Sequence, residues 1–172
     1  MTAVPTLETE RLILRGPNSR DLEPFIEFYG SERSKFAGGP KSRHQAWRSF
    51  AAELGHWQIH GFGMWSITAK GSEAALGAVG LWYPEGWPEK EIGWILWPEA
   101  ERKGIAFEAA IAARRHAYGT LGWTTAVSYI HPQNARSIAL AARLGAKRDP
   151  EAAFPGDGPC HVYRHPAPEA LQ

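Results

Sequence analysis

The sequence predicts a single α/β domain, residues 1–172, in which a mixed and mostly antiparallel sheet of about seven strands carries helices on both faces. One observation is length: 172 residues are typical of one domain, which can bury roughly two thirds of the unfolded surface. The other is hydrophobic spacing. After a short apolar run at residues 11–15, the spacing is helical up to residue 61, alternates in twos between residues 62 and 97, and then switches between the two periods.

The N-terminal third predicts one strand and two helices. A short apolar run at residues 11–15 is typical of a strand. Residues 18–21 supply helix-capping side chains, and apolar residues at helical spacing continue that helix to Tyr29. Ser42 is placed to cap a second helix, which Gly61 ends.

Three strands are expected next, and helices then alternate with strands. The segments at residues 62–68, 76–83 and 91–97 have period-two spacing and favour successive antiparallel strands. Beyond them the pattern predicts a helix, a strand, a second helix and two closing strands, at residues 105–119, 123–130, 134–144, 146–149 and 160–165.

Charge and cysteine content exclude several classes of protein. The 19 Lys and Arg residues balance 18 Asp and Glu residues, so no nucleic-acid partner is expected. The single cysteine, Cys160, cannot form an internal disulfide and fits a reducing compartment. Glu8 and Glu10 stand where a secretion signal would be basic and apolar, and no apolar run approaches ~18 residues. We therefore expect a cytoplasmic protein with no membrane partner, while a homodimer stays open.

The junction at residues 101–106 places Gly104 at the start of a predicted helix. Free main-chain N–H groups and the positive end of the helix dipole meet there, and Arg102 and Lys103 add positive charge. Such a junction favours anions, phosphates above all, because a glycine lets the anion approach the backbone closely. The alternative is an ordinary junction between a loop and a helix.

The most informative motifs lie between residues 91 and 146. They are Glu91-Ile92-Gly93-Trp94, Gly104-Ile105-Ala106-Phe107-Glu108-Ala109, Asn134 with Ser137, and Leu144-Gly145-Ala146. Together they resemble the GNAT superfamily of N-acetyltransferases. With the opening segment at residues 8–15, the sequence is most similar to the RimJ/RimL type, which acetylates N-terminal amines of ribosomal proteins. The resemblance covers nearly the whole chain.

The resemblance implies that acetyl-CoA binds where the sheet splits, between the strand ending at Trp97 and the strand ending at His131. A cofactor that pairs with an open strand edge needs the neighbouring strand displaced. Main-chain groups of three strand residues would pair with the pantetheine arm, namely Ile95, Leu96 and Trp97. The diphosphate would bind main-chain N–H groups of Arg102, Lys103, Gly104, Ile105 and Ala106, and the Asn134 amide would hold the cofactor arm.

The implied reaction is direct attack of a neutral primary amine on the thioester, with a protein N-terminal amine as the acceptor. A small-molecule amine (an antibiotic, polyamine or amino acid) is the alternative acceptor, and a non-catalytic acyl-CoA-binding domain is the alternative function. Eight tryptophans exceed what a core of this size requires, and indole suits a wall that meets ligand on one side. Trp57 and Trp87 are therefore candidates for an acceptor groove, with core packing as the alternative. No metal is expected, because His56 and His60 lack a third ligand.

Two departures from the family pattern bear on catalysis. Glu101 stands where the family has Gln or Arg, near the expected diphosphate, and Ala141 replaces the tyrosine that commonly protonates the leaving thiolate. Ser137 is the expected replacement, as a hydrogen-bond donor to a sulfur whose thiol pKa is about 8.5; the alternative is a role in the first helical turn only. Glu91 is the first candidate for the base and His131 the second, each with a structural alternative.

Overall fold

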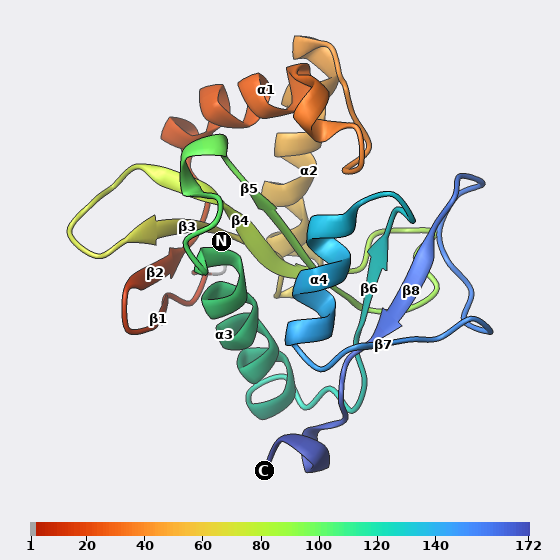
Figure 1. Ribbon diagram of the computed structural model, residues 1–172. Helices are drawn as coiled ribbons and strands as arrows, with labels where there is room; N and C mark the ends of the chain where they lie inside the picture. The colour runs from red at the N-terminus through yellow and green to blue at the C-terminus, as the bar shows by residue number, and fades with distance from the viewer. Residues whose placement is uncertain (1–2) are drawn as a thin grey trace.

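The computed structural model describes residues 3–172 and confirms the predicted mixed α/β fold. Figure 1 shows one open sheet with α3 and α4 against one face and α2 behind the other. The strands are β1 (Leu7–Glu8), β2 (Leu12–Arg15), β3 (Met64–Ala69), β4 (Ala75–Trp82), β5 (Glu91–Leu96), β6 (Val127–Ile130), β7 (Lys147–Arg148) and β8 (His161–Arg164). They lie in the order β1-β2-β3-β4-β5-β6-β8-β7, and β5 with β6 is the parallel pair.

Four α-helices cover the sheet, and four short 3-10 helices connect the elements. The α-helices are α1 (Leu22–Gly30), α2 (Arg43–His60), α3 (Ile105–Gly119) and α4 (Ala135–Arg143). The 3-10 helices are η1 (Ser19–Asp21), η2 (Glu32–Ser34), η3 (Pro98–Ala100) and η4 (Pro168–Leu171). No helix within residues 3–172 combines the length and apolar character needed to cross a bilayer.

Local sequence signals set the ends of α2 and the packing of α3. Ser42 and Gln45 form a reciprocal capping box at the start of α2. Gly61 ends the helix with φ 73°, a left-handed conformation that glycine adopts without strain. The face of α3 that packs on the sheet is built from buried alanines, Ala109, Ala110, Ala113 and Ala117, so the helix lies close to the strands.

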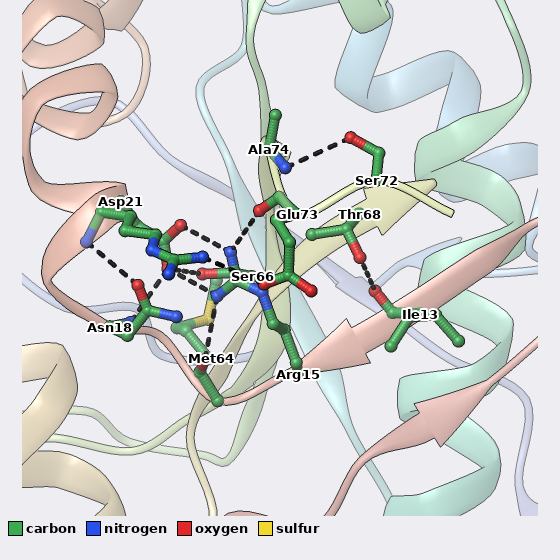
Figure 2. Close-up of polar contacts among 12 residues, drawn as sticks. Ile13, Arg15, Asn18, Asp21, Met64, Ser66, Thr68, Ser72, Glu73 and Ala74 are labelled. Carbon is green, nitrogen blue, oxygen red and sulfur yellow. Dashed lines mark hydrogen bonds and ion pairs between the residues drawn. The ribbon is translucent and has the colours of Figure 1, made fainter. Parts of the chain in front are cut away.

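A buried ion pair fixes where α1 begins on the sheet (Figure 2). Arg15 of β2 donates two hydrogen bonds of 2.8 Å to the Asp21 carboxylate, and Ser66 of β3 donates one of 2.7 Å. Burial disfavours the ionised form of Asp21, but these donors and the Asn18 main-chain N–H outweigh it and hold the pKa of this carboxyl below its usual range. The charged pair thus ties the N-terminus of α1 to two strands.

The sheet splits between β5 and β6. Their parallel pairing is confined to Glu91 opposite Val127, after which the strands diverge (Figure 1). Just beyond that pair, the Ser128 hydroxyl donates a 2.6 Å hydrogen bond to the Ile92 carbonyl and closes the narrow end of the split. The predicted opening between these two strands is therefore present, with its closed end at Glu91.

The structure differs from the sequence-based boundaries in two places. β1 was not predicted, because a strand of two residues gives no periodic signal. β6 begins at Val127 and not at Trp123. Trp123 is apolar because it is buried against Phe62, with ring centroids 5.2 Å apart, and not because it pairs in the sheet.

Candidate active site

The loop before α3 forms a cradle of free main-chain N–H groups. Arg102 has φ 62° and Gly104 has φ 73°, so left-handed residues alternate along the loop and turn successive N–H groups inward. Within the described chain, the N–H groups of residues 102–107 donate to no acceptor, and the next one, on Glu108, begins the helical pattern by bonding Gly104 O. These groups include the five predicted for the diphosphate, those of Arg102, Lys103, Gly104, Ile105 and Ala106, and the cradle fits such an anion.

Side chains from the other end of the sequence brace this cradle. Arg11 donates to the Lys103 carbonyl at 2.9 Å and to the Glu108 carboxylate at 2.6 Å. Thr9 also donates to Glu108, at 2.6 Å. The sequence predicted a strand at residues 11–15 and included residues 8–15 in the family resemblance, but it did not reveal this bracing contact, because Arg11 and Glu108 are far apart along the chain.

Glu101 is neutralised by two arginines from separate elements. Arg136 of α4 lies 2.5 Å from one carboxylate oxygen, and Arg33 of η2 contacts the other. Arg102, next to Glu101 in the sequence, is exposed and takes no part in these pairs. Glu101 therefore joins α4 and η2 beside the cradle, and its charge does not face the diphosphate site unopposed.

The edge of β5 that faces the split is defined by strand pairing. The N–H of Trp97 donates to Leu76 O in β4, so residues of the same parity, Ile95 included, direct their main-chain groups toward β4. Trp94 and Leu96 have the opposite parity and direct theirs toward β6, as the Ser128 contact with Ile92 also indicates. Of the three predicted pantetheine partners, Leu96 alone faces the split; Ile95 and Trp97 do not, and Trp94, which the sequence did not suggest, joins Leu96.

Ser137 in the first turn of α4 has a hydroxyl that accepts two hydrogen bonds. The Trp94 indole N–H donates to its oxygen at 3.2 Å and the Asn134 amide at 3.1 Å. The hydroxyl proton of Ser137 has no acceptor among the described residues, so it is free to be donated to a ligand. Two incoming hydrogen bonds polarise the hydroxyl and make it a better donor.

Asn134 and Ala141 both have structural roles in α4. Asn134 is the N-cap of α4, where its amide oxygen accepts from the Ser137 N–H and its amide nitrogen donates to the Ser137 hydroxyl. Its predicted contact with the cofactor arm stays a prediction. Ala141 is fully buried beside Ile130 and Ala146, so this position packs α4 and has no donor to offer.

Glu91 lies at the closed end of the split. Its carboxylate accepts a 2.8 Å hydrogen bond from the Trp87 indole and a longer one from the Tyr129 N–H of β6. Burial raises the pKa of Glu91 to about 7, and those two donors oppose the rise. A carboxyl with this pKa can accept a proton near neutral pH.

Glu91 and Ser137 lie on opposite faces of the sheet. Glu91 is paired with Trp82, whose ring stacks on His56 of α2 at 4.4 Å, so Glu91 faces α2. Trp94 is three residues further along β5 and faces α4, where it contacts Ser137. The two candidate catalytic groups thus flank the split from its two sides.

His131 and Cys160 are weaker candidates for reactive groups than Glu91 and Ser137. The His131 Nδ1 accepts from the Gln133 N–H at 3.1 Å, and its ring lies 4.8 Å from that of Phe36, as the structural alternative for this histidine expects. Burial, with Glu91 nearby, raises the pKa of the Cys160 thiol to about 11. That thiol is protonated near neutral pH and is a poor nucleophile.

The two candidate groove tryptophans have different surroundings. Trp57 is 3% exposed, packs against Trp65 and donates to the Met64 carbonyl, so the expectation that it lines a groove is wrong and it is a core residue. Trp87 is half-buried and holds the Glu91 carboxylate. The structure therefore brings Trp87, and not Trp57, to the candidate base.

The histidine pair on α2 serves packing. His56 donates from Nδ1 to Phe62 O and accepts from the Tyr83 N–H at Nε2, so both of its ring nitrogens are used. Among residues 3–172, no three His, Cys, Asp or Glu side chains gather as a metal site requires.

Comparisons with known proteins agree with this geometry. A family model described as an acetyltransferase (GNAT) domain matches residues 11–147. An acetyltransferase from Agrobacterium tumefaciens is 38% identical, with TM-score 0.91 over 96% of each chain. A GNAT-family acetyltransferase from Bacillus anthracis is 19% identical, with TM-score 0.75 over 94% of this chain and 96% of that one. RimL, a ribosomal L7/L12 alpha-N-protein acetyltransferase in complex with coenzyme A, is 15% identical, with TM-score 0.75 over 94% and 97%. The last two similarities concern the fold alone.

Proposed function

Because this chain belongs to the GNAT family of acetyltransferases, we propose that it transfers an acetyl group from acetyl-CoA to the N-terminal amine of a protein. Acetyl-CoA, when bound, supplies the activated thioester. The N–H groups of residues 102–107 would hold its diphosphate, and the main-chain groups of Trp94 and Leu96 would hold its pantetheine arm. The RimL-type resemblance supports the choice of acceptor.

The observation that carries this proposal is the placement of Glu91 and Ser137 on opposite faces of β5, at the split. An amine that approaches from the α2 face meets Glu91 first. The Ser137 hydroxyl, on the α4 face, has its proton free for the departing sulfur. The thioester would therefore lie between the base, Glu91, and the hydrogen-bond donor, Ser137.

Glu91 accepts the proton that the amine loses. A protein α-amine has a pKa of about 7.7–8.0, against about 10.4 for lysine, so it is partly neutral under physiological conditions. A carboxylate whose pKa is about 7 can remove the remaining proton without a large energetic mismatch. The Trp87 indole, by donating to the same carboxylate, fixes the orientation of Glu91.

Mass spectrometry of products tests the proposal. Acetyl-CoA is supplied with peptides that carry free or blocked N-termini and with a panel of small amines. We expect acetylation of free N-termini, and a loss of roughly 10²–10⁴-fold in turnover in Glu91→Gln with unchanged coenzyme A affinity. Glu85→Gln, an exposed carboxylate of the loop that precedes β5, is the matched control. Tight coenzyme A binding without transfer to any amine would instead indicate the non-catalytic acyl-CoA-binding domain.

A further inference from the structure

Glu53 is a buried carboxyl group with no hydrogen-bond or ion-pair partner among the described residues. It lies on the buried face of α2, between Phe50 and Trp57, and is 9% exposed. Within residues 3–172 its carboxylate takes part in no hydrogen bond or ion pair. Buried carboxylates are normally paired or hydrogen-bonded, because losing water without compensation is costly. Among the described residues, the fully enclosed side-chain atoms without a partner are Arg15 Nε and Trp97 Nε1, so the Glu53 oxygens keep some contact with solvent. Packing of α2 alone gives no reason for a charged residue here.

The Tyr29 hydroxyl shares this environment. Tyr29, in the last turn of α1, is 8% exposed, and its hydroxyl has no hydrogen-bond partner in the described chain. Burial raises the pKa of Tyr29, and the charges of Glu53 and Glu91 raise it further. Geometry links these groups: the Lys41 ammonium lies over the Tyr29 ring and bonds Ser49, which is one helical turn before Glu53 on α2. One turn further along α2, His56 stacks on Trp82, the cross-strand partner of Glu91.

Lys41 is the cation that faces Glu53. Its ammonium group donates to the Ser49 hydroxyl at 2.7 Å and lies 4.7 Å from the centre of the Tyr29 ring. It does not form an ion pair with Glu53, although its charge opposes the rise that burial causes in the pKa of that carboxyl. The Glu53 carboxylate stays available for a donor from outside the chain.

The sheet leaves room beside Glu91. Gly93 shares the parity of Glu91 on β5, so both face α2. A Cβ atom built on Gly93 would find only the Glu91 carboxyl within 4 Å, with Oε1 at 3.8 Å. Apart from its chain neighbours, no other residue lies within 4 Å of that position, so the surface over Gly93 beside the proposed base is open.

We propose that Glu53 and the Tyr29 hydroxyl bind a second ammonium group on the acceptor, so that the preferred substrate carries two amines a few bonds apart. The inference rests on the proposed function, since it places the reacting amine at Glu91. An ammonium group supplies the donors that both polar groups lack. Burial raises the pKa of Glu53 to about 8, so the empty site holds a largely protonated carboxyl near neutral pH; a bound ammonium lowers that pKa and favours the carboxylate, to which its attraction is stronger in a site shielded from water. A free diamine and a peptide that begins with lysine both present this chemistry.

Paired substrates test the second ammonium. For the wild type, we expect kcat/KM for 1,4-diaminobutane to exceed that for n-butylamine at least tenfold. Glu53→Gln, of equal size, should raise KM for the diamine tenfold or more and leave the monoamine unchanged. Glu27→Gln, an exposed carboxylate of α1, is the control. A peptide beginning with lysine, compared with one beginning with methionine, shows whether the second amine is carried by a peptide.

Calorimetry of 1,4-diaminobutane separates this inference from the proposed function. Wild-type binding that weakens tenfold in Glu53→Gln supports the inference even if no acetyl group is transferred. Equal binding by both proteins, or equal loss for diamine and monoamine, overturns it while leaving acetyl transfer intact. Lys41→Met tests whether Glu53 acts only as the charge partner of Lys41. If Lys41→Met weakens diamine binding as much as Glu53→Gln does, Glu53 acts through Lys41 and the inference fails.

Discussion

Replacing Ser128 by alanine is expected to weaken both the fold and coenzyme A binding. Arg114 of α3 lies 3.1 Å from Nδ1 of His165, and a guanidinium only donates, so His165 carries its proton on Nε2. That N–H donates to the Ser128 hydroxyl at 2.9 Å, and the hydroxyl donates to Ile92 O at 2.6 Å. Burial, with Arg114 nearby, lowers the pKa of His165 to about 3, which keeps the ring neutral. This chain of hydrogen bonds joins β5 to β6 at the closed end of the split.

The cost follows from the two groups that Ser128→Ala leaves unpaired. Ser128 and His165 are 2% and 3% exposed, so water does not readily replace the lost hydroxyl. A buried polar group without a partner costs about 1–3 kcal/mol, and two of them, the Ile92 carbonyl and the His165 N–H, give about 2–6 kcal/mol. Urea unfolding measures this loss. Calorimetry of coenzyme A should show a severalfold weaker affinity, because the spacing of β5 and β6 is no longer fixed.

Thr68→Val is the matched control for this variant. Thr68 is equally buried, and its hydroxyl donates to Ile13 O between β2 and β3, away from the split. It should lose about 1 kcal/mol of stability and keep its coenzyme A affinity. If Ser128→Ala also keeps its affinity while losing stability, the bond to Ile92 holds the sheet together but does not set the cofactor cleft.

Three further variants probe the site. Trp87→Phe removes the indole donor that lowers the pKa of Glu91, so the limb of the kcat/KM profile near pH 7 should shift upward, whereas Trp47→Phe, at an exposed site, should not move it. Glu101→Gln frees Arg33 and Arg136 for the phosphates of coenzyme A, so calorimetry should show severalfold tighter coenzyme A binding, and the gain should disappear at high salt. Glu99→Gln is the control. Weaker binding by Glu101→Gln would mean that Glu101 holds both arginines in their binding positions. Glu53→Gln should be more stable than the wild type at pH 8, because burial raises the pKa of Glu53 from about 4.5 to about 8 and the wild type loses this group's contribution to stability as pH rises through that window. A difference in urea midpoint between the two proteins that is the same at pH 4 and at pH 8 would contradict this.

The elements that the sequence predicted best are those set by local signals. Both ends of α3 agree with the predicted helix, because Gly104 and the alanine-rich stretch that follows it are visible in the sequence itself. Ser42 caps α2 and Gly61 ends it, as expected. Trp57 shows the limit of such reasoning. It follows Phe50 by seven residues, the spacing of one buried helix face, yet tryptophan content alone suggested a groove.

The contacts that the sequence could not reveal join distant segments. Arg33 and Arg136 are separated by about three fifths of the chain, and a single sequence does not show that both meet Glu101. The unpaired state of Glu53 was equally hidden, because it depends on what α1 and β5 place opposite α2. Charge pairing across the fold is a tertiary property, and helix or strand periodicity carries no information about it.

The alternation of β5 explains how one short strand can serve both halves of the reaction. Glu91, Gly93 and Ile95 face α2, where an amine can approach, whereas Ile92, Trp94 and Leu96 face α3 and α4. The second set also turns its main-chain groups toward the split. The odd spacing between Glu91 and Trp94 therefore places the carboxylate and the indole that supports Ser137 on opposite sides of the opening. Inserting one residue between them would bring both side chains to one face and separate the base from the amine or the serine from the sulfur.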